Sequence, residues 1–211
     1  MDDVRGFQQF KGLDRAEPPT RIPLPVYLSQ ECLDQVSKQF PWLFPEKEPP
    51  TREGDKPVVH RDVAALDVNI IENFKPFDAA GLDIVPLPVW HGDDLVSLGF
   101  SFSIRGSDGE HTNVVYISDV SRMIPETLEY IQNTLPPTDL LIVDTLLPEF
   151  KHPVHFSLTQ ATNFAKEISA KRTYLIGMSC DAFPPHDVMN DQLAKVHETI
   201  QFAHDGLVLY L

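Results

Sequence analysis

The sequence predicts an α/β protein, and three observations support this fold class. Short apolar runs bounded by Gly, Pro, Asn and Asp indicate β-strands through the middle of the chain. From residue 114 to residue 179 these runs alternate with segments whose apolar residues recur at helical spacing. The chain has 211 residues, of which 42% are hydrophobic and 23% charged, so it is long enough for one domain with a sizeable core.

The first part of the chain is punctuated by proline. The segment "RIPLPVYLS" predicts a short strand, and "SQECLDQVSKQF" predicts a helix with Ser29 as its N-terminal cap. Residues 45–57, "PEKEPPTREGDKP", are charged and rich in proline, and we expect a flexible loop there. No internal repeat is present.

The second part contains most of the predicted sheet. Residues 58–71 have the pattern of an interrupted strand, and "RGSDGEHTN" predicts a hairpin turn. The expected elements are then strands at 82–91, 95–104, 114–118, 139–146, 172–179 and 205–211, with helices at 124–134 and 157–170.

Charge and cysteine content exclude several classes of protein. A formal net charge of -14 argues against nucleic acid as a partner, because phosphate binding needs clustered Lys and Arg. No apolar run is long enough to span a membrane, and the N-terminus lacks the pattern of a signal peptide. The two cysteines, Cys32 and Cys180, do not make a disulfide framework. We therefore expect a reducing, cytoplasmic location, and targeting by a segment outside this chain stays open.

Polar side chains gather where the predicted strands end, which is where α/β sheets place ligands and chemistry. Each has an ordinary structural explanation: Asp119 and Asp144 would serve as caps, and His91 would serve as a turn residue. Their succession along the chain instead indicates a metal site, because His and Asp are ligands that zinc and similar ions prefer. The candidates are His91, Asp119, Asp144, His152, His155, Cys180 and Asp181.

Several segments together resemble the metallo-β-lactamase superfamily. They are "PFDAAGLDIVPLPVWHGDDLVSLGFSF", "VVYISDVSRMIPETLEYI", "DLLIVDTL" and "YLIGM". The most similar branch contains the bacterial cyclic phosphodiesterase of phosphonate breakdown and its plant and fungal relatives. The resemblance spans nearly the whole chain. It implies a single partial domain over residues 1–211, an αββα sandwich whose dinuclear metal site lies at one edge of the two sheets.

The resemblance also implies roles for individual residues. In "PVWHG", His91 would bind the first metal ion, and in "ISDVS", Asp119 would bridge the two ions. In "HPVHFSL", His155 would contact the phosphate or protonate the leaving oxygen. Asp144 would orient a ligand or a loop. Relatives have a histidine ligand where this chain has Cys180, and a thiolate is a competent zinc ligand. His186 and Asp187 are the alternatives at that position.

One motif of the superfamily is absent. No two histidines in the chain are separated by one residue, so the HxHxDH motif that supplies most ligands is missing. Relatives carry it just before a segment like "MDDVRGF". We therefore expect an N-terminally truncated chain that lacks the first strands of the sandwich and exposes a sheet edge. Such an edge would favour pairing with a partner, including a homodimer.

Three hypotheses about function follow. The first is a hydrolase that depends on zinc or manganese, acts on a small phosphodiester, and is inactive in this chain by itself. The second is a metallo-β-lactamase-like domain that no longer catalyses and serves binding or regulation. The third is a plain α/β protein without metal. The family does not define the natural substrate, because this scaffold supports several chemistries.

Overall fold

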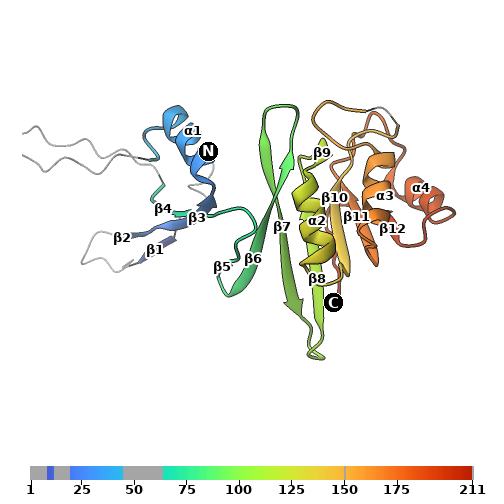
Figure 1. Cartoon of the computed structure of the whole chain (residues 1–211), viewed down its shortest axis with the longest axis horizontal. Coiled ribbons are helices and arrows are strands. Elements are labelled where there is room, and N and C mark those ends of the chain that lie inside the picture. Colours follow the sequence, from blue (N-terminus) through green and yellow to red (C-terminus); the bar gives the residue numbers. More distant parts are fainter. Residues whose placement is uncertain (1–8, 12–19, 45–63, 150, 211) are drawn as a thin grey trace, which may run out of the picture. The chain divides into compact units, whose positions relative to one another are not determined.

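The protein forms two compact units, residues Met1–Glu72 and Asn73–Leu211, in a computed structural model (Figure 1). The structure describes residues 9–11, 20–44, 64–149 and 151–210. The loop expected at residues 45–57 lies outside these described residues. In the part of the chain that is described, no helix has the length and apolar character needed to cross a bilayer.

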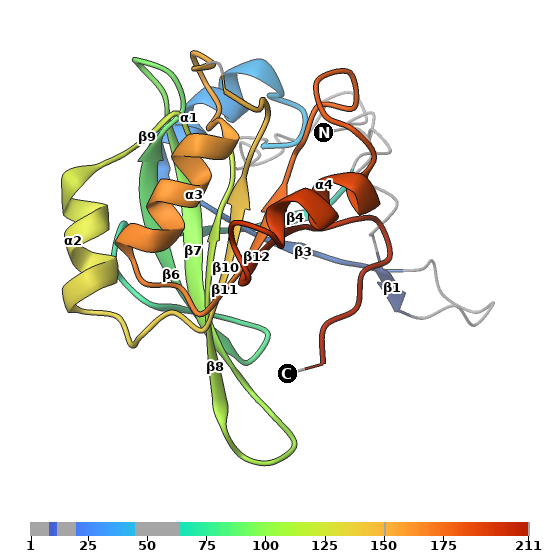
Figure 2. The same cartoon turned by 90° about the vertical axis from the view of Figure 1, so that its right-hand side faces the viewer.

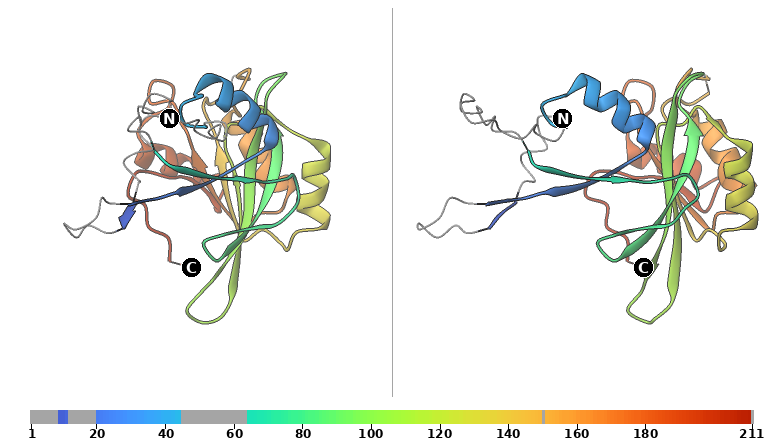
Figure 3. Two further views of the ribbon diagram at one scale, coloured as in Figure 1. Left: turned by 90° about the vertical axis from the view of Figure 1, so that its left-hand side faces the viewer. Right: turned by 60° about the vertical axis from the view of Figure 1, so that its left-hand side comes forward.

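Among its described residues, the first unit contains four short strands and one helix. Figure 3 shows these elements in blue and teal. Strands β1 (Gln9–Lys11) and β2 (Thr20–Ile22) pair antiparallel, whereas β3 (Leu24–Leu28) and β4 (Leu66–Ile70) pair parallel. Helix α1 (Gln30–Gln39) begins where the sequence predicts, because the Ser29 hydroxyl accepts the Cys32 N–H at 3.1 Å. The predicted strand and capped helix in this region are therefore confirmed.

An eight-stranded mixed sheet forms the centre of the second unit. Its order is β12-β11-β10-β8-β7-β6-β5, and β9 pairs with β6 beside the main path. The strands are β5 (Phe77–Ala79), β6 (Leu82–Trp90), β7 (Val96–Arg105), β8 (His111–Ile117), β9 (Arg122–Met123), β10 (Leu140–Asp144), β11 (Arg172–Ile176) and β12 (Ile200–Phe202).

Three helices cover one face of this sheet: α2 (Pro125–Asn133), α3 (Leu158–Glu167) and α4 (His186–Leu193) (Figure 2). All three contribute to one buried cluster, for example through Ile131, Phe164 and Met189. The sheet supplies alternate residues to the same cluster, including Val115 and Ile117 of β8, because successive strand side chains point to opposite faces. The layer is therefore a sheet with helices on one face, unlike a doubly wound sheet.

The opposite face of the sheet carries a smaller apolar cluster centred on Val114, Leu140 and Tyr174. Leu209, near the C-terminus, packs against this cluster but belongs to no strand. The strand expected at 205–211 is therefore wrong for the described residues. The last strand among the described residues is β12, and Leu207, Val208 and Tyr210 are exposed.

Strand direction explains why the candidate residues can meet. Strands β8, β10, β11 and β12 are parallel to one another, and β6 runs the same way because β7 is antiparallel to both β6 and β8. Their carboxyl ends therefore lie at one edge of the sheet. The β7–β8 hairpin lies at the other end of β8 (Figure 2).

Candidate metal centre

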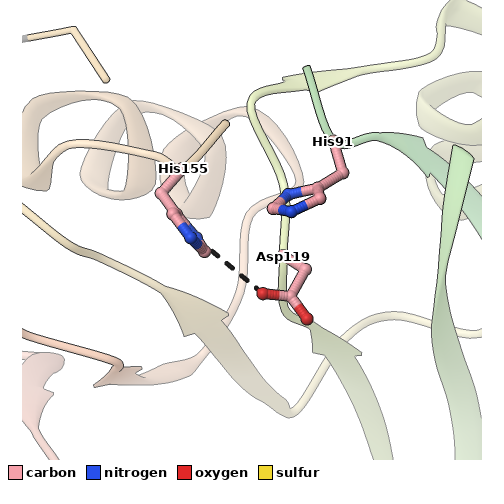
Figure 4. Close-up of side chains that lie close together, drawn as sticks. All are labelled: His91, Asp119 and His155. Atoms are coloured by element: carbon pink, nitrogen blue, oxygen red, sulfur yellow. Dashed lines mark ion pairs between the residues drawn. The ribbon is translucent and has the colours of Figure 1, made fainter. Parts of the chain in front are cut away.

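Three predicted site residues come together at this edge of the sheet. His91, Asp119 and His155 each offer one ligand atom, and these atoms all lie within 4.8 Å of one another. Figure 4 shows the three side chains pointing toward a common space from three separate segments. Among the described residues, this is the only group of three or more His, Cys, Asp or Glu side chains that meets this criterion. The donor set of two imidazoles and one carboxylate suits a divalent ion such as zinc.

His91 follows directly on the last residue of β6. Its backbone N–H donates to the Leu95 carbonyl at 2.8 Å, which closes the turn after the strand. Its ring Nδ1 lies 2.9 Å from the Val154 carbonyl oxygen. Because a carbonyl oxygen can only accept, Nδ1 is the donor in this contact, and in the neutral ring Nε2 then has the lone pair. This is the arrangement that a metal-binding histidine requires.

Asp119 lies two residues beyond the end of β8. Helix α2 starts at Pro125 and has Ile124 at its N-terminal cap, so Asp119 does not cap this helix. Its backbone φ is 53°, a left-handed conformation that is uncommon for residues other than glycine. The Ser97 hydroxyl donates to the Asp119 carbonyl at 2.8 Å. The Asp119 carboxylate is 62% exposed and therefore accessible to a ligand.

His155 is held by a buried carboxylate. Its Nδ1 lies 2.5 Å from Asp144 Oδ2 and 3.9 Å from Asp119 Oδ1. Asp144 ends β10, and its side chain is only 4% exposed. Burial raises the pKa of Asp144 above its ordinary value, while hydrogen bonds from His155 and from the Val120 N–H act in the opposite direction. The Asp144 carboxylate is therefore placed to hold the His155 ring at Nδ1, and its expected role of orienting a ligand or a loop stays a prediction.

The backbone just after β11 leaves space for the Asp144 carboxylate. Gly177 follows β11 with a φ of +75°, and a Cβ built there would lie 2.7 Å from Asp144 Oδ1. A side chain at this position would therefore push against the group that orients His155. The ring of His152, from the same loop as His155, lies 5.4 Å from the His155 ring between centroids.

Cys180 does not join the cluster. It is exposed and lines a cavity of about 370 Å³ at the carboxyl ends of β11 and β12, together with His186 and His204. Asp187 does not line this cavity. His204 was not predicted from the sequence, and neither were Ser121 and Gln160, which hydrogen-bond beside the cluster. Ser121 stands two residues after Asp119, and that proximity was the only signal in the sequence.

Comparisons with known proteins agree with this architecture. A family model described as the beta-lactamase superfamily domain matches residues 2–178. No curated protein matches the chain. A crystal structure of a diphosphatase from the PhnP family is similar, with 24% sequence identity, a TM-score of 0.64, and coverage of 90% of this chain and 59% of that chain.

Two further solved structures share the fold at lower identity. The metallo-β-lactamase fold protein YhfI from Bacillus subtilis is 20% identical, with a TM-score of 0.58 over 89% of this chain and 65% of its own. The short form of human tRNase Z is 16% identical, with a TM-score of 0.54 over 90% of this chain and 68% of its own. The chain thus spans less than two thirds of the first two proteins. With the family model matching most of its length, the chain belongs to the β-lactamase superfamily and has a metallo-β-lactamase fold.

Proposed function

We propose that this chain is part of a metal-dependent hydrolase that acts on small phosphoesters, most like a phosphodiesterase. The observation that carries the proposal is the convergence of His91, Asp119 and His155 within 4.8 Å at the edge of the sheet. The similarity to a PhnP-family diphosphatase supports a phosphorus-containing substrate. The chain's net charge of -14 favours a small phosphodiester over a long nucleic acid.

His91 and Asp119 would hold a divalent ion, zinc or manganese. His91 offers Nε2 because its Nδ1 donates to Val154, and Asp119 offers an exposed carboxylate from the turn after β8. When bound, such an ion supplies positive charge that stabilises phosphoryl oxygens and lowers the pKa of water. It would also offset the acidic character of the protein for an anionic substrate.

His155 would act on the substrate directly. Asp144 fixes its Nδ1, so Nε2 is the ring nitrogen left for a phosphoryl oxygen or for the leaving oxygen. A protonated Nε2 would donate to either oxygen, and the buried Asp144 carboxylate would hold the ring in place while it does so. In this proposal His91 and Asp119 bind the ion, and His155 contacts the substrate.

We also propose that the three converging groups are too few for appreciable turnover. Two protein ligands and one substrate-facing histidine can hold one ion, whereas phosphodiester cleavage at a two-metal site needs ligands for both ions. The 211-residue chain itself is therefore expected to bind metal weakly and to hydrolyse bis(p-nitrophenyl) phosphate at no more than the background rate.

Isothermal titration of the metal-free chain with Zn²⁺ or Mn²⁺ tests the ion site. We expect His91→Ala and Asp119→Ala each to weaken affinity, whereas His111→Ala, in the hairpin at the other end of β8, leaves it unchanged. Equal affinity in the wild-type chain and in both site variants would contradict the proposed ligands.

The phosphoester assignment has its own test. Inorganic phosphate is expected to bind the zinc-loaded chain, and His155→Gln is expected to weaken phosphate binding without weakening zinc binding. Fusing an HxHxDH segment to the chain is expected to raise turnover of bis(p-nitrophenyl) phosphate. A fused protein that binds two ions and remains inactive would favour the alternative, a domain that binds or regulates without catalysis.

A further inference from the structure

Ser121 connects two segments that carry candidate metal ligands. It follows Asp119 by two residues, and its side chain reaches the turn around His91. Its hydroxyl accepts the Gly92 N–H at 3.0 Å and donates to the Trp90 carbonyl at 3.1 Å. Both neighbours of His91 in the chain are therefore bonded to one hydroxyl. Ser121 is only 4% exposed, so water has little access to these hydrogen bonds.

Further contacts hold Ser121 itself in place. Its backbone N–H donates to the Trp90 carbonyl at 2.7 Å, and its carbonyl lies 3.4 Å from Gln160 Nε2. The Gln160 Oε1 accepts from Ser157, the capping residue of α3, through the backbone N–H at 3.1 Å. This series of hydrogen bonds runs from the start of α3, just beyond His155, to the turn that contains His91.

The turn around His91 is confined from its other side by Val154. Gly92 has a φ of +90°, and a Cβ built there would lie 3.3 Å from Val154 Cγ1. The His91 Nδ1 meets the Val154 carbonyl at 2.9 Å. A small displacement of the turn would therefore lengthen this bond, and the bond determines which ring nitrogen carries the proton.

We propose that Ser121 is a positioning residue whose hydroxyl holds the His91 turn so that the ring keeps its proton on Nδ1 and presents Nε2 to the metal centre. The role of the arrangement in presenting Nε2 to a metal ion rests on the proposed function. The Ser121 hydroxyl bonds only to backbone groups of the chain itself, so this arrangement can be measured without metal and without activity.

Long-range ¹H–¹⁵N spectra of the metal-free, ¹⁵N-labelled chain measure the tautomer of each histidine at one alkaline pH. His91→Gln identifies the signals of His91 among the eight histidines. In the wild-type chain we expect His91 to be protonated at Nδ1. In Ser121→Ala we expect a mixture of the two tautomers, with a smaller share protonated at Nδ1.

Thr127→Val is the matched control. Thr127 is fully buried, and its hydroxyl donates to the Pro88 carbonyl of β6 at 2.6 Å, so this variant also removes a buried hydroxyl bonded to the strand that precedes His91. It is expected to lose stability and to keep the wild-type His91 signals. Ser121→Thr retains the hydroxyl and is expected to keep the Nδ1 tautomer. Ser121→Cys keeps a side chain of similar size with a weaker hydrogen-bonding group and is expected to be intermediate.

Identical His91 signals in wild-type, Ser121→Ala and Thr127→Val would overturn the role of Ser121, as would a wild-type His91 protonated at Nε2. A Co²⁺ titration of the same samples separates this result from the proposed function. We expect Ser121→Ala to weaken Co²⁺ binding about tenfold and Thr127→Val to leave it unchanged. A wild-type chain that binds no Co²⁺ would contradict the proposed function, while the tautomer spectra still decide the role of Ser121.

Discussion

The Nδ1 atom of His155 lies 2.5 Å from Oδ2 of Asp144, a carboxylate buried at the end of β10. The two residues are 11 positions apart, and His155 also lies beside Asp119. The side chain of Asp144 is 4% exposed and that of His155 is 23% exposed. The pair thus has a buried end that fixes orientation and a more accessible end that faces the candidate metal centre.

Asp144→Asn tests this orientation. Asparagine replaces one of the two acceptor oxygens with an NH₂ donor and removes the charge, so it serves His155 and the Val120 N–H less well than the carboxylate. We expect the bond to His155 to weaken by about 1–2 kcal/mol, because a charge-assisted bond becomes a neutral one. Long-range ¹H–¹⁵N spectra should then show a mixture of His155 tautomers. Asp139→Asn, which removes a bonded carboxylate elsewhere, should leave His155 unchanged.

Gly177→Ala is expected to disturb the same pair from the backbone side. Alanine at a φ of +75° is strained, and its Cβ would also lie 2.7 Å from Asp144 Oδ1. Gly206→Ala is the matched control, because Gly206 has a φ of +79° and a Cβ added there would meet nothing within 4 Å. Backbone strain should cost each variant about 1 kcal/mol of unfolding free energy.

The difference between the two glycine variants carries the prediction. Only Gly177→Ala should lose additional stability in urea unfolding and show altered His155 signals. Equal losses, with His155 unaffected in both, would mean that Asp144 accommodates the methyl group without moving.

The lowered pKa of Asp139 predicts that the stability of the protein depends on pH. The Asn113 N–H and the Lys171 ammonium, 2.9 Å and 2.6 Å from the carboxylate, hold the pKa of Asp139 below its ordinary value of 3.8. A lowered pKa means that the folded state favours the ionised form. The resulting stabilisation is present above pH 3.8 and is lost as the pH falls through the lower folded-state pKa.

Two variants measure this contribution. Asp139→Asn should lower the unfolding free energy by about 1 kcal/mol at neutral pH, and the difference from wild type should shrink below the unfolded-state pKa. Lys171→Met should cost less, because the backbone bond to Asn113 is the larger cause and Lys171 is 69% exposed. Urea unfolding at neutral pH and at a pH below 3.8 provides the measurement. A larger loss of stability in Lys171→Met than in Asp139→Asn would show that Lys171, and not Asn113, is the main cause of the lowered pKa.

The Cys180→Ser variant tests whether Cys180 binds the metal ion, as the resemblance implies, or does not, as its place in the structure indicates. The resemblance to relatives implied that Cys180 is a metal ligand, whereas the structure places it in a cavity with His186 and His204. We expect Cys180→Ser to leave Co²⁺ affinity unchanged and His91→Ala to reduce it about tenfold or more. Absorption from a cobalt–thiolate bond in the wild-type chain, lost in Cys180→Ser, would show that the cysteine does bind the ion.

Sequence patterns by themselves predicted most of the second unit. The apolar runs and helical spacing gave β6, β7, β8, β10, β11, α2 and α3 to within a few residues, because burial of one face imposes a period on the chain. The same patterns misplaced the last strand, since Leu209 reaches an apolar surface by packing without any strand pairing. They also missed α4, whose N-terminal cap is a proline without a side-chain hydrogen bond.

The candidate site, too, could be predicted only in part from the sequence. Residue type and position at strand ends, together with the resemblance, selected His91, Asp119 and His155 from the sequence. Only the tertiary structure decided which of these side chains meet, because that depends on strand direction and on loops that bring distant segments together. It paired Asp144 with His155, left Cys180 outside the group of His91, Asp119 and His155, and placed the Ser121 hydroxyl between the neighbours of His91. Hydrogen bonds between residues far apart in the sequence leave no periodic signal, so these relationships appear only once the chain is folded.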